Sequence, residues 1–353
     1  MLEDQFHFIL NLKTIMLKTN EFKYLRKRKS MKKIIFNSFG NEKEMKIVEE
    51  EQQKPTGSQV LIKHMAIGVN FIDIYQRTGL YPLSLPSRLG LEAAGIVEEI
   101  GDNVECFKKG DRVCYCNGPL GAYATHNLVP ENLLLNLPDE IEFETVASSL
   151  LKGVTAYFLM HDIYPVGKDD TIIFHAAAGG VGSIASGWAK SLGAKVIGTV
   201  GSDEKIDYAK SKGCDHVVNI SKESFKDLAI QVTNNEGVSV VYDSIGKNTI
   251  NDSMDSLKTK GLLVSFGNAS GVPDPINILD LMKKGSLFIT RPTLFDYVKT
   301  REQLVNASDK YFAVLKSGAV KIDVQQKFAL DEVGEAHVAM SNRKTIGTTV
   351  LVP

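Results

Sequence analysis

The stretch TIIFHAAAGGVGSIASGWAKSLG, residues 171–193, decides the fold of this chain. The apolar run Thr171–His175 predicts a buried strand, and Val181–Leu192 carries apolar and small residues at helical spacing before Gly193. The segment between them, AAAGGVG, matches the dinucleotide-binding fingerprint with Ala177 in place of its first glycine. We therefore predict a strand, a phosphate-binding loop and a helix whose amino end faces a pyrophosphate.

The other two fingerprint glycines are present as Gly179 and Gly182. Without a side chain, Gly179 lets the backbone approach the pyrophosphate, and Gly182 lets the helix pack close to the strand. A plain tight turn is the alternative interpretation. The strand signal before the loop and the helix signal after it favour the nucleotide site.

Strand and helix signals alternate along the chain after residue 153. Further strands are predicted at Lys195–Val200, His216–Asn219, Val238–Asp243 and Gly261–Phe266. Helices are predicted at Asp203–Lys212, Ser221–Thr233 and Asn248–Leu257. Such alternation indicates βαβ crossovers and a buried parallel sheet, and we assign residues 153–289 to this domain.

Short strands and glycine turns dominate residues 31–152. Strands are expected at Lys32–Phe36, Val60–Ile67, Gly95–Ile100 and Arg112–Tyr115. They indicate a partly closed β-barrel or a sandwich. The helix Arg301–Ser317 and the strands Gln326–Ala329 and Gly347–Leu351 do not extend the alternation, so residues 290–353 are expected to fold back on this first domain.

The charge balance excludes several classes of function. The 353 residues include 41 Lys and Arg against 42 Asp and Glu, a net charge of −1, which gathers neither nucleic acid nor an anionic membrane. No apolar run is long enough to cross a bilayer. Four cysteines are too few for a disulfide scaffold, so a reducing, cytoplasmic location is expected. Cys114 and Cys116 lack the spacing of a zinc knuckle and are predicted to be two small, half-buried side chains.

Residues 1–30 differ from the rest of the chain, because their basic residues gather between Lys18 and Lys29. We predict a disordered extension, with Met31 as a candidate true start. An organelle transit peptide and a basic nucleic-acid tail are alternatives, although Glu3, Asp4 and Glu21 fit a transit peptide poorly.

The end of the second strand of the parallel sheet decides which cofactor is expected. NAD enzymes place a carboxylate there to bind the ribose 2′-hydroxyl, but this strand ends in Gly201 and Ser202. Lys205 is placed to neutralise a 2′-phosphate, although it could equally be a solvated surface lysine. Asp203 and Glu204 bring negative charge nearby and are expected to face water at a helix start. NADPH is therefore the predicted cofactor.

Taken together, six motifs resemble the zinc-independent quinone oxidoreductases, the zeta-crystallin-like family of the medium-chain dehydrogenases and reductases. The motifs are GVNFID (68–73), LGLEAAG (89–95), LKGVTAY (151–157), FHAAAGGVG (174–182), VYDSIG (241–246) and SFGN (265–268). The resemblance covers residues 32–353. It implies a GroES-like β-barrel domain built from both chain ends, a doubly wound Rossmann domain between them, a cleft for nicotinamide and acceptor, and a homodimer.

The same resemblance assigns site residues. Asn70 and Thr155 should face the nicotinamide end of the cofactor. The pyrophosphate should be held by Gly179, Gly180, Val181 and Gly182, the 2′-phosphate by Gly201, Ser202 and Lys205, and the rest of the nucleotide by Ser244, Phe266, Gly267 and Arg343. One departure weakens the phosphate grip, because Ile220 stands where the family often has a tyrosine.

Zinc ligands of related alcohol dehydrogenases are replaced in this chain. Positions that match a cysteine and a histidine ligand hold Asn70 and Leu91, whose side chains cannot replace a thiolate and an imidazole on Zn²⁺. No metal site is therefore expected. Without a Lewis acid, an acceptor that is already electrophilic suits hydride transfer better than a simple alcohol or aldehyde.

The predicted reaction is NADPH-dependent reduction of quinones by hydride or electron transfer. Tyr75 and Tyr81 are expected in a loop facing the cleft, where a hydroxyl could bind the acceptor, or where each ring could simply be packed. No general acid is identified, and water is an alternative source of the proton. An NADPH-dependent alkenal or enoyl reductase and a non-catalytic protein that binds NADPH or RNA are the rival interpretations.

Overall fold

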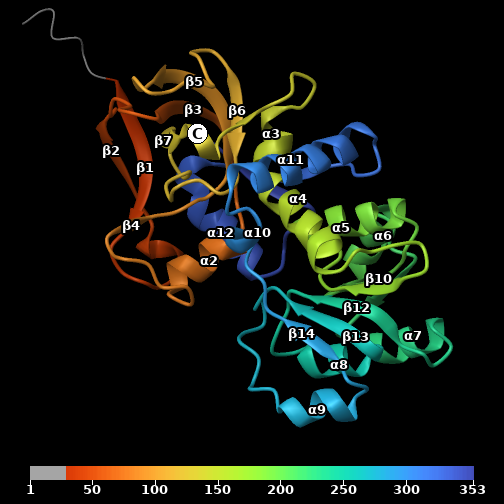
Figure 1. Ribbon diagram of the computed structural model, residues 1–353. Coiled ribbons are helices and arrows are strands. Elements are labelled where there is room, and N and C mark those ends of the chain that lie inside the picture. Colours follow the sequence, from red (N-terminus) through yellow and green to blue (C-terminus); the bar gives the residue numbers. More distant parts are fainter. Residues whose placement is uncertain (1–28) are drawn as a thin grey trace, which may run out of the picture.

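The computed structural model describes residues 29–353, which form two bodies joined along one side (Figure 1). Most of the predicted N-terminal extension, residues 1–28, lies outside the described residues. Its last two residues belong to the first body. Ser30 begins strand β1 (Ser30–Phe36), and the ammonium of Lys29 pairs with the Glu98 carboxylate.

A six-stranded sheet in the order β11-β10-β9-β12-β13-β14 forms the centre of the second body. All its neighbouring strands are parallel, as predicted. The strands are β9 (Thr171–Phe174), β10 (Lys195–Val200), β11 (His216–Asn219), β12 (Val238–Asp243), β13 (Leu257–Ser265) and β14 (Phe288–Thr290). Because strand order reverses between β9 and β12, a crevice is expected beyond the carboxyl ends of these two strands.

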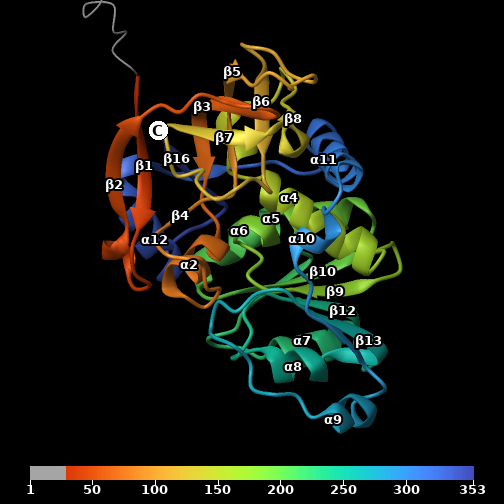
Figure 2. The same ribbon diagram turned by 60° about the vertical axis from the view of Figure 1, so that its left-hand side comes forward.

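Helices cover both faces of this sheet (Figure 2). Trp188 of α5 (Gly180–Ser191) and Ala209 of α6 (Ile206–Ser211) belong to the core cluster on one face. Phe225 of α7 (Phe225–Val232) and Met254 of α8 (Ile250–Asp255) are buried in the cluster on the other face. The predicted doubly wound α/β architecture is therefore confirmed.

Three predicted helices of this body are shorter than expected. The helix predicted from Asp203 begins with a 3-10 turn, η4 (Asp203–Lys205), before α6. α7 begins at Phe225 because the Ser224 hydroxyl accepts the Asp227 N–H at 3.1 Å, which sets the helix start there. α8 ends at Asp255 because Leu257 already pairs with β12 as the first residue of β13.

The first body contains two sheets built around β3 (Gln59–Gly68) and β1. One sheet has the order β15-β16-β3-β5-β6-β8 with β7 also paired to β3, and the other has the order β2-β1-β4. Their remaining strands are β2 (Lys46–Glu51), β4 (Ser87–Arg88), β5 (Ala93–Ile100), β6 (Arg112–Tyr115), β7 (His126–Pro130), β8 (Leu135–Asn136), β15 (Val324–Ala329) and β16 (Thr348–Val352). This arrangement agrees with the predicted partly closed barrel.

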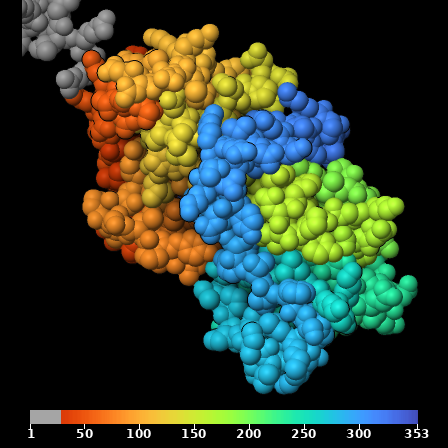
Figure 3. Space-filling model, viewed as in Figure 1, coloured from red at the N-terminus to blue at the C-terminus, as the bar shows by residue number. Residues whose placement is uncertain are grey.

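The C-terminal segment returns to the first body, as expected from the break in the alternation. Val350 and Leu351 of β16 pair antiparallel with Gly68 and Ile67 of β3. Figure 3 shows the segment after β14 running up between the two bodies. That segment contains α10 (Leu294–Tyr297) and leads to α11 (Arg301–Lys316), which packs on α4 (Leu150–Tyr157). The predicted domain limits 31–152, 153–289 and 290–353 stay a proposal.

The segment expected to be a loop between Asn70 and Tyr81 contains a helix instead, α2 (Phe71–Thr78). The Asp73 carboxylate accepts the Asn70 N–H at 2.8 Å, and Gly79 ends the helix with φ 82°. The N-x-x-D spacing and the following glycine were sequence signals for this helix.

The remaining helical segments are short. They are η1 (Glu42–Glu44), η2 (Glu131–Leu133), α3 (Phe143–Ala147), the π-helix η3 (Phe158–Ile163), α9 (Ile278–Lys283), η5 (Leu330–Glu332) and α12 (Val333–Ser341). Within residues 29–353, no helix has the length and apolar character needed to span a membrane.

Candidate active site

The predicted phosphate loop leaves β9 and enters α5 by a turn that only small residues allow. An added Cβ at Gly182 would lie 2.3 Å from the Ala176 carbonyl oxygen and 2.7 Å from the Ala177 Cα, closer than real contacts. Gly179 begins the helix as its N-cap. The close approach of helix and strand predicted for Gly182 is therefore present.

At the carboxyl end of β10, two basic residues from distant parts of the chain meet. The Lys205 ammonium donates to the carbonyl oxygens of Arg343 at 2.6 Å and Thr345 at 2.9 Å. Burial and, after it, the charge of Arg343 lower the pKa of Lys205. An added Cβ at Gly201 meets nothing within 4 Å, so this strand end is open. Positive charge beside open space fits a 2′-phosphate.

Of the two neighbouring acidic residues, Asp203 has hydrogen-bond and ion-pair partners of its own. The Asp203 carboxylate accepts the Asn219 side-chain N–H at 2.7 Å and pairs with Lys222. The hydrogen bond with Lys222 is the main cause that lowers the pKa of Asp203. Asp203 and Glu204 are both exposed, as expected, and Ser202 precedes them as the N-cap of η4. Ile220 is half-buried and its N–H donates to Val200.

The ends of β12 and β13 approach each other at the same edge of the sheet. An added Cβ at Gly267 would lie 2.5 Å from the Ser244 carbonyl oxygen. The Phe266 N–H donates to the Asp243 carbonyl oxygen at 2.8 Å, and its ring centroid is 5.7 Å from that of Phe174 on β9. The structure thus places these predicted nucleotide residues beside the phosphate loop, while their roles stay predictions.

A buried polar cluster surrounds Asn70, the residue that precedes α2. The Asn70 side-chain oxygen accepts the Lys152 ammonium at 2.7 Å, and its Nδ2 donates to a Glu92 carboxylate oxygen at 2.8 Å. Glu92 is fully buried, and Lys152 is only 6% exposed. Burial raises the pKa of Glu92, while Lys152 and the N–H groups of Asn70 and Leu151 act in the opposite direction.

Sequence reasoning assigned no role to Lys152 or Glu92, although both lie inside motifs that carried the resemblance. A lysine between apolar and small residues on a predicted helix was the available signal, because buried lysines are rare unless paired. The partners could not be inferred, since Asn70 precedes Lys152 by 82 positions in the chain.

Thr155 stands one turn after Lys152 on α4 and is 8% exposed. Its hydroxyl donates to the Leu151 carbonyl oxygen of its own helix at 2.7 Å. The hydroxyl proton is therefore used within the helix, and the oxygen remains as an acceptor. This arrangement fits contact with a nicotinamide amide better than proton donation to a substrate.

The two tyrosines predicted for the cleft, Tyr75 and Tyr81, connect the two bodies of the molecule through hydrogen bonds. The Tyr75 hydroxyl, on helix α2 rather than in a loop, accepts the Asn268 N–H at 2.8 Å. The Tyr81 hydroxyl accepts an Arg291 N–H at 2.7 Å, and the two tyrosine rings pack edge to face with centroids 5.1 Å apart. Burial raises the pKa of Tyr75. Both rings are packed, yet each hydroxyl keeps its proton for donation.

A metal centre finds no support among residues 29–353, where no group of three or more His, Cys, Asp or Glu side chains is placed to hold an ion. Cys114 and Cys116 are both fully buried, so the prediction of half-buried side chains is wrong. Burial raises the pKa of each thiol, which keeps it protonated and inert.

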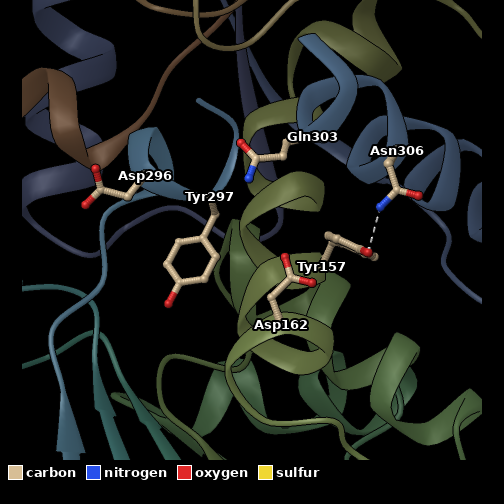
Figure 4. Close-up of a pocket in the computed structure, with 6 residues that line it drawn as sticks. All are labelled: Tyr157, Asp162, Asp296, Tyr297, Gln303 and Asn306. Atoms are coloured by element: carbon tan, nitrogen blue, oxygen red, sulfur yellow. Dashed lines mark hydrogen bonds between the residues drawn. The ribbon is translucent and has the colours of Figure 1, made fainter. Parts of the chain in front are cut away.

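A separate cavity of about 370 Å³ lies between α4, η3, α10 and α11 (Figure 4). Its lining residues are Tyr157, Asp162, Asp296, Tyr297, Gln303 and Asn306. Within it, the Asn306 amide donates to the Tyr157 hydroxyl at 2.9 Å. None of the residues predicted to contact cofactor or acceptor lines this cavity, so it is not the predicted cleft.

Comparison with known families defines the class of protein. Residues 56–139 match the alcohol dehydrogenase GroES-like domain, and residues 180–302 match the zinc-binding dehydrogenase domain. The chain is thus a two-domain dehydrogenase or reductase of the medium-chain type.

Individual relatives define the family. The chain is 45% identical to a quinone oxidoreductase of Salmonella typhimurium, over 91% of this chain and 99% of the relative. It is 44% identical to a 2-haloacrylate reductase of a Burkholderia species, over 85% and 92% of the two chains. Escherichia coli quinone oxidoreductase complexed with NADPH superposes with a TM-score of 0.89 at 43% identity, covering 91% and 100%. The chain belongs to the quinone oxidoreductase family, which confirms the resemblance seen in its motifs.

Proposed function

We propose that this chain is an NADPH-dependent quinone reductase. The observation that carries the proposal is the end of β10, where Lys205 and Arg343 meet beside open space and the strand is followed by Gly201 and Ser202 instead of a carboxylate. Two solved structures of similar fold, Escherichia coli quinone oxidoreductase and a mycobacterial protein, are complexes with NADPH. Both support the cofactor assignment.

The residues fit this cofactor. Gly179, Gly180, Val181 and Gly182 would hold the pyrophosphate, and Ser244, Phe266 and Gly267 would line the nucleotide beyond it. Gly201, Ser202, Lys205 and Arg343 would hold the 2′-phosphate. When bound, NADPH supplies the hydride for the reaction.

The acceptor would lie between the nicotinamide end and the aromatic side chains of α2. Asn70 and Thr155 would contact the nicotinamide end, and Phe71, Tyr75 and Tyr81 offer an aromatic surface. Stacking of a flat ring on such a surface contributes about 0.5–1.5 kcal/mol. A planar, electron-poor quinone therefore suits the cleft, and the tyrosine hydroxyls can donate to its oxygen atoms.

We also propose that the enzyme works without zinc. Leu91 is buried and apolar, and the Asn70 amide is occupied by Lys152 and Glu92. Purified protein should contain no stoichiometric zinc by elemental analysis, and a chelator should leave its activity unchanged. One zinc per chain, lost together with activity, would contradict this proposal.

A panel of acceptors tests the function. NADPH oxidation is expected with small benzo- and naphthoquinones, and no reverse reaction with ethanol or sorbitol and NADP⁺. A second candidate, reduction of an activated double bond, is favoured by the 44% identity to a 2-haloacrylate reductase. The panel therefore includes 2-chloroacrylate and a 2-alkenal. Turnover of these compounds without turnover of quinones would transfer the assignment to the second candidate.

A homodimer is proposed from the edge of the parallel sheet. Phe288 and Ile289 of β14 and Ile278, Leu279 and Met282 of α9 are exposed apolar residues at one end of the molecule (Figures 1 and 3). A second copy pairing along this edge strand would cover them. A single species of twice the chain mass in analytical ultracentrifugation is expected.

Partners and location follow from composition. The near-neutral charge gives no support to RNA binding. The four cysteines are all free, which supports a reducing location such as the cytoplasm.

A further inference from the structure

Three side chains from three distant segments form a buried polar cluster that contains the ion pair of Lys152 and Glu92. Lys152 comes from α4, Asn70 precedes α2, and Glu92 precedes β5. They are 6%, 4% and 0% exposed. Burying an ion pair of this kind costs free energy unless its polar atoms are hydrogen-bonded. The hydrogen-bond partners of each side chain therefore indicate the role of the cluster.

The Lys152 ammonium has no N–H left over for a substrate. It donates to the Asn70 side-chain oxygen at 2.7 Å and to the Val69 carbonyl oxygen at 3.2 Å, and its third side faces Glu92 at 3.6 Å. An ammonium has three donors, and all three directions are taken by the protein. Direct proton donation from Lys152 to an acceptor would break one of these contacts.

The Asn70 amide, in contrast, has one donor left. Its oxygen accepts a hydrogen bond from the Lys152 ammonium, and one Nδ2–H donates a hydrogen bond to the Glu92 carboxylate. The second Nδ2–H has no partner among residues 29–353. The reversed amide would place its NH₂ against the ammonium and its oxygen against the carboxylate, so the two charges allow only one orientation.

The Lys152 stem also reaches the phosphate loop. An added Cβ at Gly180 would lie 2.6 Å from Lys152 Cδ and 2.8 Å from Lys152 Cε. Around Glu92 the packing is equally tight, because an added Cβ at Gly68 would lie 2.4 Å from its Oε2. The cluster therefore stands in fixed contact with the loop assigned to the pyrophosphate.

We propose that Lys152 and Glu92 are positioning residues that hold the free Asn70 N–H toward the carbonyl oxygen of the acceptor. The inference rests on the proposed function. The ammonium draws electron density from the amide oxygen and so strengthens the opposite N–H as a donor. Asn70 then stabilises the negative charge that develops on the acceptor oxygen during hydride transfer, the task a Lewis acid performs elsewhere.

A double-mutant cycle tests this link between the ion pair and Asn70. Lys152→Met alone would leave a buried, unpaired Glu92, so the ion pair is replaced as a unit with Lys152→Met and Glu92→Gln, which keep the volume and the acceptor for Leu151. Asn70→Ala and the triple variant complete the cycle. Each is measured for kcat and KM with NADPH and 1,4-benzoquinone, and for NADPH affinity and melting temperature.

Asn70→Ala is expected to lower kcat on the order of 100-fold, the usual effect of losing one oxyanion donor. The ion-pair variant should lower kcat by at least about tenfold with NADPH affinity within about threefold of wild type. Adding Asn70→Ala to the ion-pair variant should then cost less than the full Asn70→Ala effect, because its donor is already misplaced.

A wild-type kcat in the folded ion-pair variant, or effects that simply multiply in the triple variant, would overturn the inference. So would a loss confined to melting temperature, since a purely structural ion pair would produce that result. A wild type that reduces neither quinones nor activated double bonds would overturn the proposed function. An active wild type with multiplying effects would overturn this inference alone.

Discussion

The two sides of the proposed cleft are built on different principles. The nucleotide side, from β9 to β13, uses backbone: Gly182 and Gly267 bring main-chain atoms together where no Cβ fits. The acceptor side uses side chains: Asn70, Lys152 and Glu92 are bonded across 22 and 82 positions of the chain.

This difference has a physical consequence. A loop of exposed backbone offers N–H groups and space, which suits the phosphate groups of a cofactor that many enzymes use. A cluster of buried side chains fixes direction and charge, and it suits one reacting oxygen. Substitutions on the nucleotide side should therefore lower cofactor affinity. Substitutions on the acceptor side should change turnover or the pH dependence of stability.

The largest effect is expected from Gly182→Val. The added side chain would meet Ala176 and Ala177 atoms at less than 3 Å, and overpacking typically costs about 1–3 kcal/mol, occasionally more. NADPH affinity, followed by cofactor fluorescence, should fall more than about a hundredfold.

Gly167→Val is the matched control, because an added Cβ there meets nothing within 4 Å. If both variants bind NADPH like the wild type, the loop of exposed backbone is not what holds the cofactor, and the contrast between the two sides fails.

The next largest effect is expected at the proposed 2′-phosphate site on the nucleotide side. Lys205→Ala should remove most of the preference for NADPH over NADH, since losing a charged partner of a phosphate costs about 1.5–3 kcal/mol. Both dissociation constants are measured by fluorescence titration. Lys210→Ala, an exposed lysine on α6, is the control. A wild type that binds NADPH and NADH equally would reject the 2′-phosphate site.

A third prediction concerns Asp73, the buried carboxyl that caps α2 behind Asn70. Burial raises the pKa of Asp73 to about 7, against the hydrogen bonds from Tyr123 and Asn70. Because the folded pKa lies above the unfolded value, the unfolded state binds fewer protons between about pH 4 and 7. This carboxyl's contribution to stability is therefore full below that range and is lost as the pH rises through it.

Asp73→Asn removes this titration. Urea unfolding should show a free energy that depends less on pH in the variant than in the wild type, by up to about 1.4 kcal/mol per pH unit. Parallel pH profiles for the two proteins would contradict this prediction. They would show that burial does not raise the pKa of Asp73.

The smallest effect is expected where the two sides touch. Tyr75→Phe removes the hydrogen bond from Asn268, worth about 1 kcal/mol, and leaves the ring contacts with Phe71 and Tyr81. KM for a quinone should rise about fivefold with NADPH affinity unchanged. A change in NADPH affinity of the same size would place Tyr75 on the nucleotide side instead.

Local patterns were sufficient for much of the nucleotide side. The strand, the glycines and the helix of residues 171–193 lie within one short segment, and sterics alone require Gly182 at that turn. Strand limits such as Arg112–Tyr115 also matched, since alternation and flanking turns are local. The helix α2 was missed because its eight residues are too few for a clear helical period.

Contacts between distant residues were decided only by the tertiary structure. Lys205 meets the Arg343 carbonyl across 138 positions, and Asn268 donates to Tyr75 across 193. Motif resemblance proposed several of these residues, but not that Lys152 and Glu92 hold the Asn70 amide. A buried lysine's partner depends on which segments the two sheets bring together, and no spacing along the chain contains that information. The sequence by itself therefore determined the fold and the cofactor loop. The tertiary packing decided which charged side chains surround Asn70 and how its amide is oriented.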